Sequence, residues 1–171
     1  MNVLLERMIR AAKLDVSLYE EVEANPGLMK EAGLVVILSS LAAGIGTITQ
    51  AGISGLIFGT IAALVGWFIW AYLTMIIGTK LLPVPETDAD YGQLLRTIGF
   101  SSSPGVARVL GIIPVIGPVI QFVVGIWMLA AMVVAVRQAL DYSSTGRAIL
   151  VCIIGWIVQF VVLALFFALV T

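Results

Sequence analysis

Long apolar runs are the feature that most restricts how this chain of 171 residues can fold. Hydrophobic residues make up 61% of the sequence and charged residues only 11%, and the apolar residues form continuous stretches instead of alternating with polar ones. Soluble domains carry about 25% charged residues. Inside a bilayer the backbone must satisfy its own hydrogen bonds, so solidly apolar runs form helices, whereas a barrel needs alternation. We therefore predict an all-α, polytopic transmembrane helical bundle.

The breaks between the runs predict about five spans. We place them at residues 32–49, 53–77 and 104–116, then from the turn at Gly117-Pro118 to residue 135, and at 148–170. The third span is short and broken, because Gly111 and Pro114 interrupt it and Gly117-Pro118 forms a tight turn after it. At 1.5 Å per residue it is too short for a core of about 30 Å. It is either a span through a thinned bilayer or a re-entrant segment.

Residues 1–30 are predicted to form a cytoplasmic, amphipathic segment ahead of a transmembrane domain at residues 31–171. Apolar residues of its first part share one helical face, and the charged ones lie away from it. The segment either lies flat on the membrane surface or packs on the protein's own loops. Asn25-Pro26 is typical of a cap followed by a new helix. Without a continuous apolar stretch here, we expect the first span to be an uncleaved insertion signal.

The one long hydrophilic connection, residues 79–103, is expected to contain a short helix at residues 91–98. Asp90 is among its candidate N-cap residues, and Gly99 ends it. Its apolar edge, formed by Leu94, Leu95 and Ile98, predicts that the helix lies along the membrane interface with that edge inward.

The distribution of charge predicts the topology. Lysine and arginine collect on the cytoplasmic side of a membrane. With five spans, all nine Lys and Arg residues fall on one side, Arg108 included. With four spans, Arg137 and Arg147 fall on the other side. We therefore expect a multi-pass protein of the plasma or inner membrane with a cytoplasmic N-terminus and a C-terminus outside.

Several short motifs follow one another in a familiar order. They are LYEEVEANP at residues 18–26, DYGQLLRTIGFS at 90–101, GIIPVIG at 111–117, AVRQAL at 135–140 and TGRAI at 145–149. The order resembles the Yip family, whose eukaryotic members interact with Rab GTPases. The resemblance implies five helices, a cytosolic N-terminus and a short C-terminus on the far side.

One departure limits what the resemblance implies about function. The eukaryotic members carry an Asp-Leu-Tyr-Gly-Pro-type motif in a longer N-terminal region, and the nearest match here is Asp90-Tyr91-Gly92 in another context. This points to a prokaryotic member, and a role in vesicle trafficking is not carried over.

The residue inventory argues against an enzyme. The chain has no histidine, and none of its ten acidic residues falls within a predicted span, so the usual groups for acid–base, nucleophilic or metal chemistry are missing from the membrane. The single cysteine, Cys152, cannot form an internal disulfide or a cysteine metal cluster. A net charge of −1 gives nucleic acid no basic surface. We expect no catalysis, cofactor, metal or nucleic-acid partner.

Two sets of residues are candidates for interaction. The first is a cytoplasmic interaction face for lipid phosphates or an unidentified protein partner, made of Tyr91, Arg96, Arg108, Arg137 and Arg147. Arg108 either marks a functional site within the membrane or extends to the cytoplasmic headgroups. The second is a ridge of small residues at spacing four, made of Ala51, Gly55, Gly59 and Ala63. The ridge serves either helix packing inside the monomer or an oligomer.

Two functions fit this pattern. The first is a scaffold or membrane-organising protein that acts by binding. The alternative is a small transporter or channel with a path between spans 3 and 5. A polar cavity around Arg108, Gln121 and Gln159 would favour transport, and a closed apolar interior would favour the scaffold.

The topology can be tested by cysteine labelling in a Cys152→Ala background. Cysteine in place of Gln50 should react with an impermeant maleimide added outside the cells, and cysteine in place of Ser143 should not, because the charge rule puts these positions on opposite sides. Labelling at Ser143 from outside would contradict five spans and support four.

Overall fold

The computed structural model describes residues 3–170, without the side chains of residues 162–163 and 165–170. The described residues form helices and contain no strand. The elements are α1 (Val3–Ala12), α2 (Val16–Ala24), η1 (Pro26–Leu28), α3 (Met29–Gly46), α4 (Ile48–Ile76), η2 (Ile77–Leu81), α5 (Tyr91–Ser101), η3 (Ser103–Ile112), α6 (Gly117–Ala139) and α7 (Thr145–Val170).

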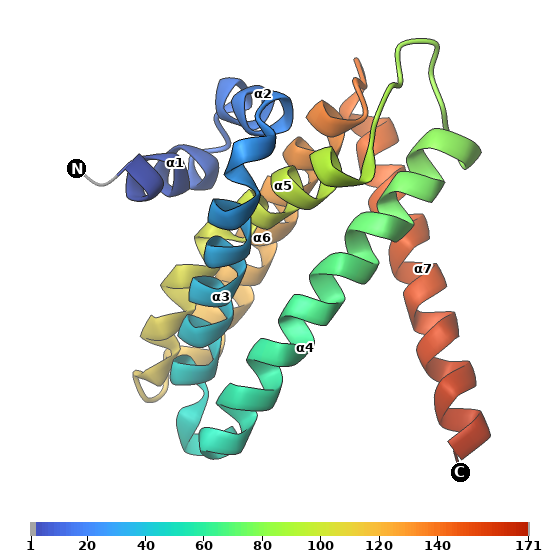
Figure 1. Ribbon diagram of the computed structural model, residues 1–171. Coiled ribbons are helices and arrows are strands. Elements are labelled where there is room, and N and C mark those ends of the chain that lie inside the picture. Colours follow the sequence, from blue (N-terminus) through green and yellow to red (C-terminus); the bar gives the residue numbers. More distant parts are fainter. Residues whose placement is uncertain (1–2, 171) are drawn as a thin grey trace.

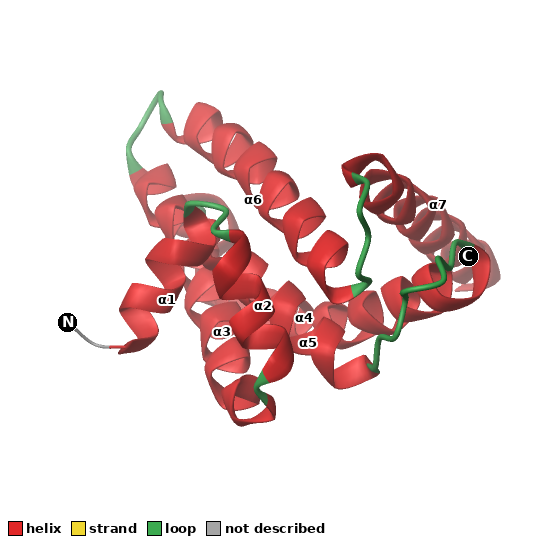
Figure 2. Ribbon diagram, turned by 90° about the horizontal axis from the view of Figure 1, so that it is seen from above, coloured by secondary structure: helices red, strands yellow, loops and turns green. Residues whose placement is uncertain are grey.

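The chain runs back and forth through a helical bundle, with alternating directions in α3, α4, the α5–η3 unit, α6 and α7 (Figure 1). One end, here called the N-terminal end, carries α1, α2 and the loops at residues 82–90 and 140–144. The other, the turn end, carries the turn at Thr47, the turn at residues 113–116 and the end of α7. Viewed from above, α1 and α2 lie over α3, away from α7 (Figure 2).

Among the described residues, three helical segments are long and apolar enough to cross a membrane: Pro26–Gly46, Ile48–Leu81 and Gly117–Ala139. Thr145–Val161 is a further apolar helical stretch. The predicted all-α, polytopic bundle is therefore confirmed.

Local chemistry at the helix ends explains several boundaries. The Asn25 side chain accepts a hydrogen bond from the Gly27 backbone N–H at 3.0 Å, and Pro26 begins η1, so the predicted cap and start are confirmed. The first reversal is tighter than expected. The chain turns at Thr47, and Gly52, with φ +63°, breaks the helical path of α4. That conformation suits glycine, which lacks a Cβ.

The third crossing differs most from the prediction. It begins with α5, and residues 103–112 continue it as a 3₁₀ helix that covers about 20 Å, because this helix rises about 2.0 Å per residue. The predicted helix at residues 91–98 is present and extends to Ser101, and residues 103–112 of the predicted span at 104–116 form the 3₁₀ helix. Whether α5 lies along the membrane interface stays a prediction. Every residue from Leu94 to Ser101 is buried, and α5 packs against α2, α3, α4 and α6.

The α5–η3 unit packs so closely because of glycines spaced six residues apart. Six residues are two turns of a 3₁₀ helix, so Gly105 and Gly111 lie on one face of η3. A Cβ on Gly105 would clash with the Ser39 hydroxyl of α3, and one on Gly111 would clash with the Gln121 amide of α6. Gly99 similarly abuts Ala32. Glycine thus lets η3 lie between α3 and α6.

Adding a methyl group at this contact should destabilise the protein. We expect Gly105→Ala to lower the free energy of unfolding by about 1–3 kcal/mol, the usual cost of overpacking. Thermal unfolding in detergent measures this. Gly59→Ala is the matched control, since no atom lies within 4 Å of its added Cβ, and it should be neutral or slightly stabilising. Ser39→Gly should restore stability to Gly105→Ala. An unchanged Tm in Gly105→Ala would contradict the close contact.

Candidate functional site: a cavity in the bundle and its charged ends

The N-terminal segment packs on the protein's own helices. Leu18, Tyr19 and Val22 of α2 are fully buried in the core of the bundle. The Tyr19 hydroxyl donates to the Ala11 carbonyl at 3.2 Å. On α6, the Trp127 indole N–H donates to the Ala12 carbonyl at 2.7 Å. These contacts fix α1 and α2 against the protein itself, as one of the two expectations for this segment had it, but against its helices α5 and α6 and not against its loops.

Ion pairs tie the same segment together. Arg7 contacts Glu21 and Glu31, each at 3.0 Å, and so joins α1 to α2 and to the start of α3. Arg10 contacts Asp15 at 2.8 Å and Glu21 at 2.9 Å. Hydrogen bonding to Arg10 lowers the pKa of Asp15 to about 2. The charges of the N-terminal segment are therefore largely satisfied within the protein.

Arg96 is buried and holds the end of α2. Its Nε donates to the Val22 carbonyl at 2.9 Å, and a terminal nitrogen donates to the Glu23 carbonyl. A cation suits this place because the last carbonyls of a helix lack partners and carry partial negative charge. In this structure Arg96 joins α5 to α2 and is not a free surface cation.

The other candidates at the N-terminal end bond to backbone carbonyls. Arg137 reaches Tyr142 O at 3.1 Å and Ser143 O at 3.3 Å, and so closes the loop after α6. Arg147 reaches Pro83 O at 3.4 Å. The Tyr91 hydroxyl donates to Phe68 O at 2.9 Å. The structure therefore places Tyr91, Arg96, Arg137 and Arg147 at one end, each engaged with the backbone.

Arg108 does not join them. It lies on η3 near the turn end, where its carbonyl accepts a hydrogen bond from the Gln121 amide at 3.2 Å. The predicted grouping of all basic residues on one side therefore fails for this residue, because its crossing begins at Tyr91 and Arg108 lies well along it. The five candidates do not form a single face in this structure.

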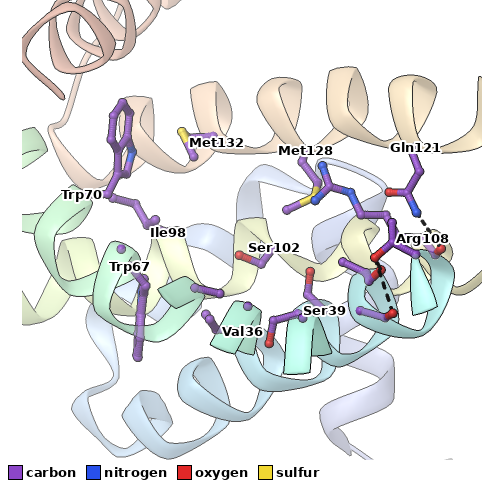
Figure 3. A pocket seen from close by; sticks show the side chains of 18 of the residues that line it. Val36, Ser39, Trp67, Trp70, Ile98, Ser102, Arg108, Gln121, Met128 and Met132 are labelled. Atoms are coloured by element: carbon purple, nitrogen blue, oxygen red, sulfur yellow. Dashed lines mark hydrogen bonds between the residues drawn. The ribbon is translucent and has the colours of Figure 1, made fainter. Parts of the chain in front are cut away.

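A cavity of about 610 Å³ opens within the bundle beside Arg108 (Figure 3). Residues from α3, α4, α5, η3, α6 and α7 line it. Its polar residues include Ser39, Ser102, Arg108, Gln121 and Gln159. On α7, Trp156 and Gln159 are exposed at its rim.

The cavity is closed toward the N-terminal end. Trp67 and Trp70 of α4 are nearly buried, and with Ile98 of α5 they line that end of it. The Trp67 indole N–H donates to the Leu95 carbonyl at 2.9 Å, which fixes the ring against α5. Beyond them lies the buried part of α5. The polar lining therefore does not continue through the bundle.

The ridge of small residues lines this cavity. Gly55, Gly59 and Ala63 are among the lining residues. A Cβ on Gly59 would meet no atom within 4 Å, and one on Gly55 would meet only Ala51 of the same helix. The ridge thus leaves space open beside α4, while the glycines of α5 and η3 make the close helix contacts.

The Arg108 guanidinium makes no hydrogen bond or ion pair with the described residues, and its Nε is buried without a partner. Figure 3 shows it extending across η3 toward Met128 of α6. A terminal nitrogen lies 3.6 Å from the position that a Cβ on Gly125 would take. The second buried side-chain nitrogen without a partner among the described residues is Trp70 Nε1, also in the cavity lining.

Sequence reasoning missed the serines and tryptophans of this cavity. Ser39-Ser40 in the middle of the first span was a usable signal, because a hydroxyl pair within an apolar helix needs a partner or a polar space. The enclosure by Trp67 and Trp70 depends on tertiary packing and has no local signal.

A model of the Yip1 domain matches residues 19–166, from α2 into α7. The chain belongs to the Yip1 family. The match confirms the resemblance drawn from the sequence motifs, and it spans the cavity and the Arg96 contact. No curated protein and no solved structure matches this Yip1-domain chain. The chain is thus a multi-pass membrane protein of the Yip1 family. Its function is inferred below from the geometry of its own cavity.

Glu23 gives the folded Yip1 domain a pH dependence. Burial, and then the nearby charge of Asp141, raise the pKa of Glu23 from its ordinary 4.5 to about 7. Between these values the folded protein binds more protons than the unfolded chain, so stability falls as pH rises. We expect Glu23→Gln to flatten the fall in Tm between pH 5 and about pH 7.5. Glu6→Gln, at an exposed site on α1, is the control, and its Tm should fall with pH as that of the wild type does. A slope that survives Glu23→Gln would assign the effect to other groups.

Proposed function

We propose that this Yip1-family protein organises its membrane by binding a membrane-derived amphipathic molecule in the cavity between α4 and α6. The cavity itself carries the proposal. Its volume of about 610 Å³ lies within the range of small-molecule sites, about 300–1,000 Å³. A bundle that served only as a structural support would be expected to fill such a space with side chains.

The two parts of the lining match the two parts of an amphiphile. Glycine, alanine and methionine residues of α4 and α6 offer an apolar wall wide enough for an acyl chain. Arg108 and Gln121 stand at the turn end. The exposed rim on α7 gives access from the side, which in a membrane is the lipid phase.

Transport is the second candidate, because the cavity gathers Arg108, Gln121 and Gln159. A transport path must also continue to the other end of the bundle. Here Trp67 and Trp70 close that end, so binding at one end is the better supported reading. We propose no catalysis, since the chain has no histidine and no Asp or Glu is among the described residues that line the cavity.

For the cellular setting we propose the plasma or inner membrane, with the N-terminal end in the cytoplasm. The Lys and Arg residues other than Arg108 support this orientation, since they lie on elements at that end. Lipids are the proposed partners of the cavity. A protein partner at the cytoplasmic end, or a second copy of the chain, is compatible with it.

Filling the cavity tests the proposal. Gly59→Phe should weaken binding of a spin-labelled phospholipid about tenfold, which corresponds to about 1.4 kcal/mol, because the ring occupies the open space beside α4. Electron paramagnetic resonance titration in detergent measures the binding. Ile57→Phe is the control, since Ile57 is 51% exposed and lies outside the cavity lining. Equal binding by both variants would exclude this cavity as the site.

A further inference from the structure

We infer that the ligand of this cavity is a phospholipid whose phosphate is bound by the Arg108 guanidinium. The inference rests on the proposed function and deepens it by naming the chemistry of the ligand.

Arg108 needs an anion from outside the protein. An arginine carries five N–H donors and stays protonated, and none of those on Arg108 has a partner among the described residues. The acidic residues of the chain lie at residues 6–31, at 86–90 and at 141. These segments belong to the N-terminal end. No carboxylate of η3 or α6 can serve, since neither element contains one.

The surrounding groups favour a phosphate. The planar guanidinium binds two oxygens of a phosphate or carboxylate at once, which an ammonium cannot do. Ser39 and Ser102 present hydroxyls to the same cavity, and neither hydroxyl bonds to a described residue. Trp70 adds a buried, unpaired N–H at the far end. A ligand rich in acceptor oxygens, with phosphate and ester groups, would satisfy these donors.

The position of Arg108 favours a lipid as the source of that phosphate. Arg108 precedes Ile113 at the turn end by five residues, which is about 10 Å along a 3₁₀ helix. A headgroup that enters from the turn end would therefore reach about 10 Å into a hydrocarbon core of about 30 Å to meet Arg108. The cavity then continues along Gly59 and Ala63 toward Met132. A free phosphate ion would leave this apolar part empty, whereas an acyl chain would fill it.

The experiment compares two lipids with the same acyl chains on the full-length protein in detergent. Dioleoyl-phosphatidylglycerol carries the phosphate, and dioleoylglycerol lacks it. Phosphatidylglycerol should raise the Tm of the wild-type protein by about 5 °C more than dioleoylglycerol does. Inorganic phosphate forms a third arm. A shift of equal size with inorganic phosphate alone would indicate a site for a small ion and overturn the lipid assignment.

Arg108→Gln should abolish the difference between the two lipids. Its Tm without lipid should equal or exceed that of the wild type, because a half-buried cation without a partner among the described residues has been removed. Arg108→Lys keeps the charge but lacks the planar guanidinium, so the difference between the Tm shifts of the two lipids should become smaller without disappearing. Arg147→Gln, at an exposed arginine of the other end, should behave like the wild type. A lower lipid-free Tm in Arg108→Gln would show that the guanidinium supports the fold and would overturn the assignment.

The cavity-filling variant separates the two levels of the proposal. If Gly59→Phe loses lipid binding while Arg108→Gln keeps its preference for phosphatidylglycerol, the cavity binds lipid but Arg108 does not bind the phosphate. If neither variant changes binding, the proposed function fails together with this inference.

Discussion

The close approach of η3 to α3 and α6 is the contact on which the rest of the bundle depends. In a lipid environment apolar side chains gain nothing by leaving lipid for protein, so helices associate mainly through tight packing and hydrogen bonds. Glycines at positions 99, 105 and 111 supply that packing by bringing backbones within direct contact. With η3 set between α3 and α6, α4 lies against α3 and α5. Its small-residue face, Gly59 included, is left facing α6 across the cavity.

Helix caps could be predicted from the sequence. The distant partners of charged side chains could not. The cap at Asn25, and Asp90 as a capping residue bonded to Gln93 N at 2.8 Å, follow from residue types and neighbours. The burial of Arg96 could not be predicted from its neighbours in the sequence. Its partners are the carbonyls of Val22 and Glu23, more than 70 positions away. No local pattern identifies such a pairing.

The spacing of small residues shows a second limit. A spacing of four suggests an α-helical contact, and it drew attention to Gly55 and Gly59. The contact that forms uses a spacing of six, from Gly105 to Gly111, which shares one face only in a 3₁₀ helix. Reading this signal requires knowing the helix type first. Arg108 was misplaced for a related reason, since the charge rule describes loops and says little about an arginine inside a crossing segment.

The two ends of the bundle differ in how far their charged groups are satisfied. At the N-terminal end, arginines bond to carboxylates or carbonyls. Of the two tryptophans that close the cavity there, Trp67 donates to a carbonyl of α5, and Trp70 Nε1 has no partner among the described residues. At the turn end, Arg108 keeps an unpaired guanidinium beside an open cavity. Packing alone would favour an apolar residue there and a larger side chain at Gly59, because both changes remove an energetic cost. Features that cost stability are typical of functional sites, so the N-terminal end is best understood as the framework and the turn end as the binding region.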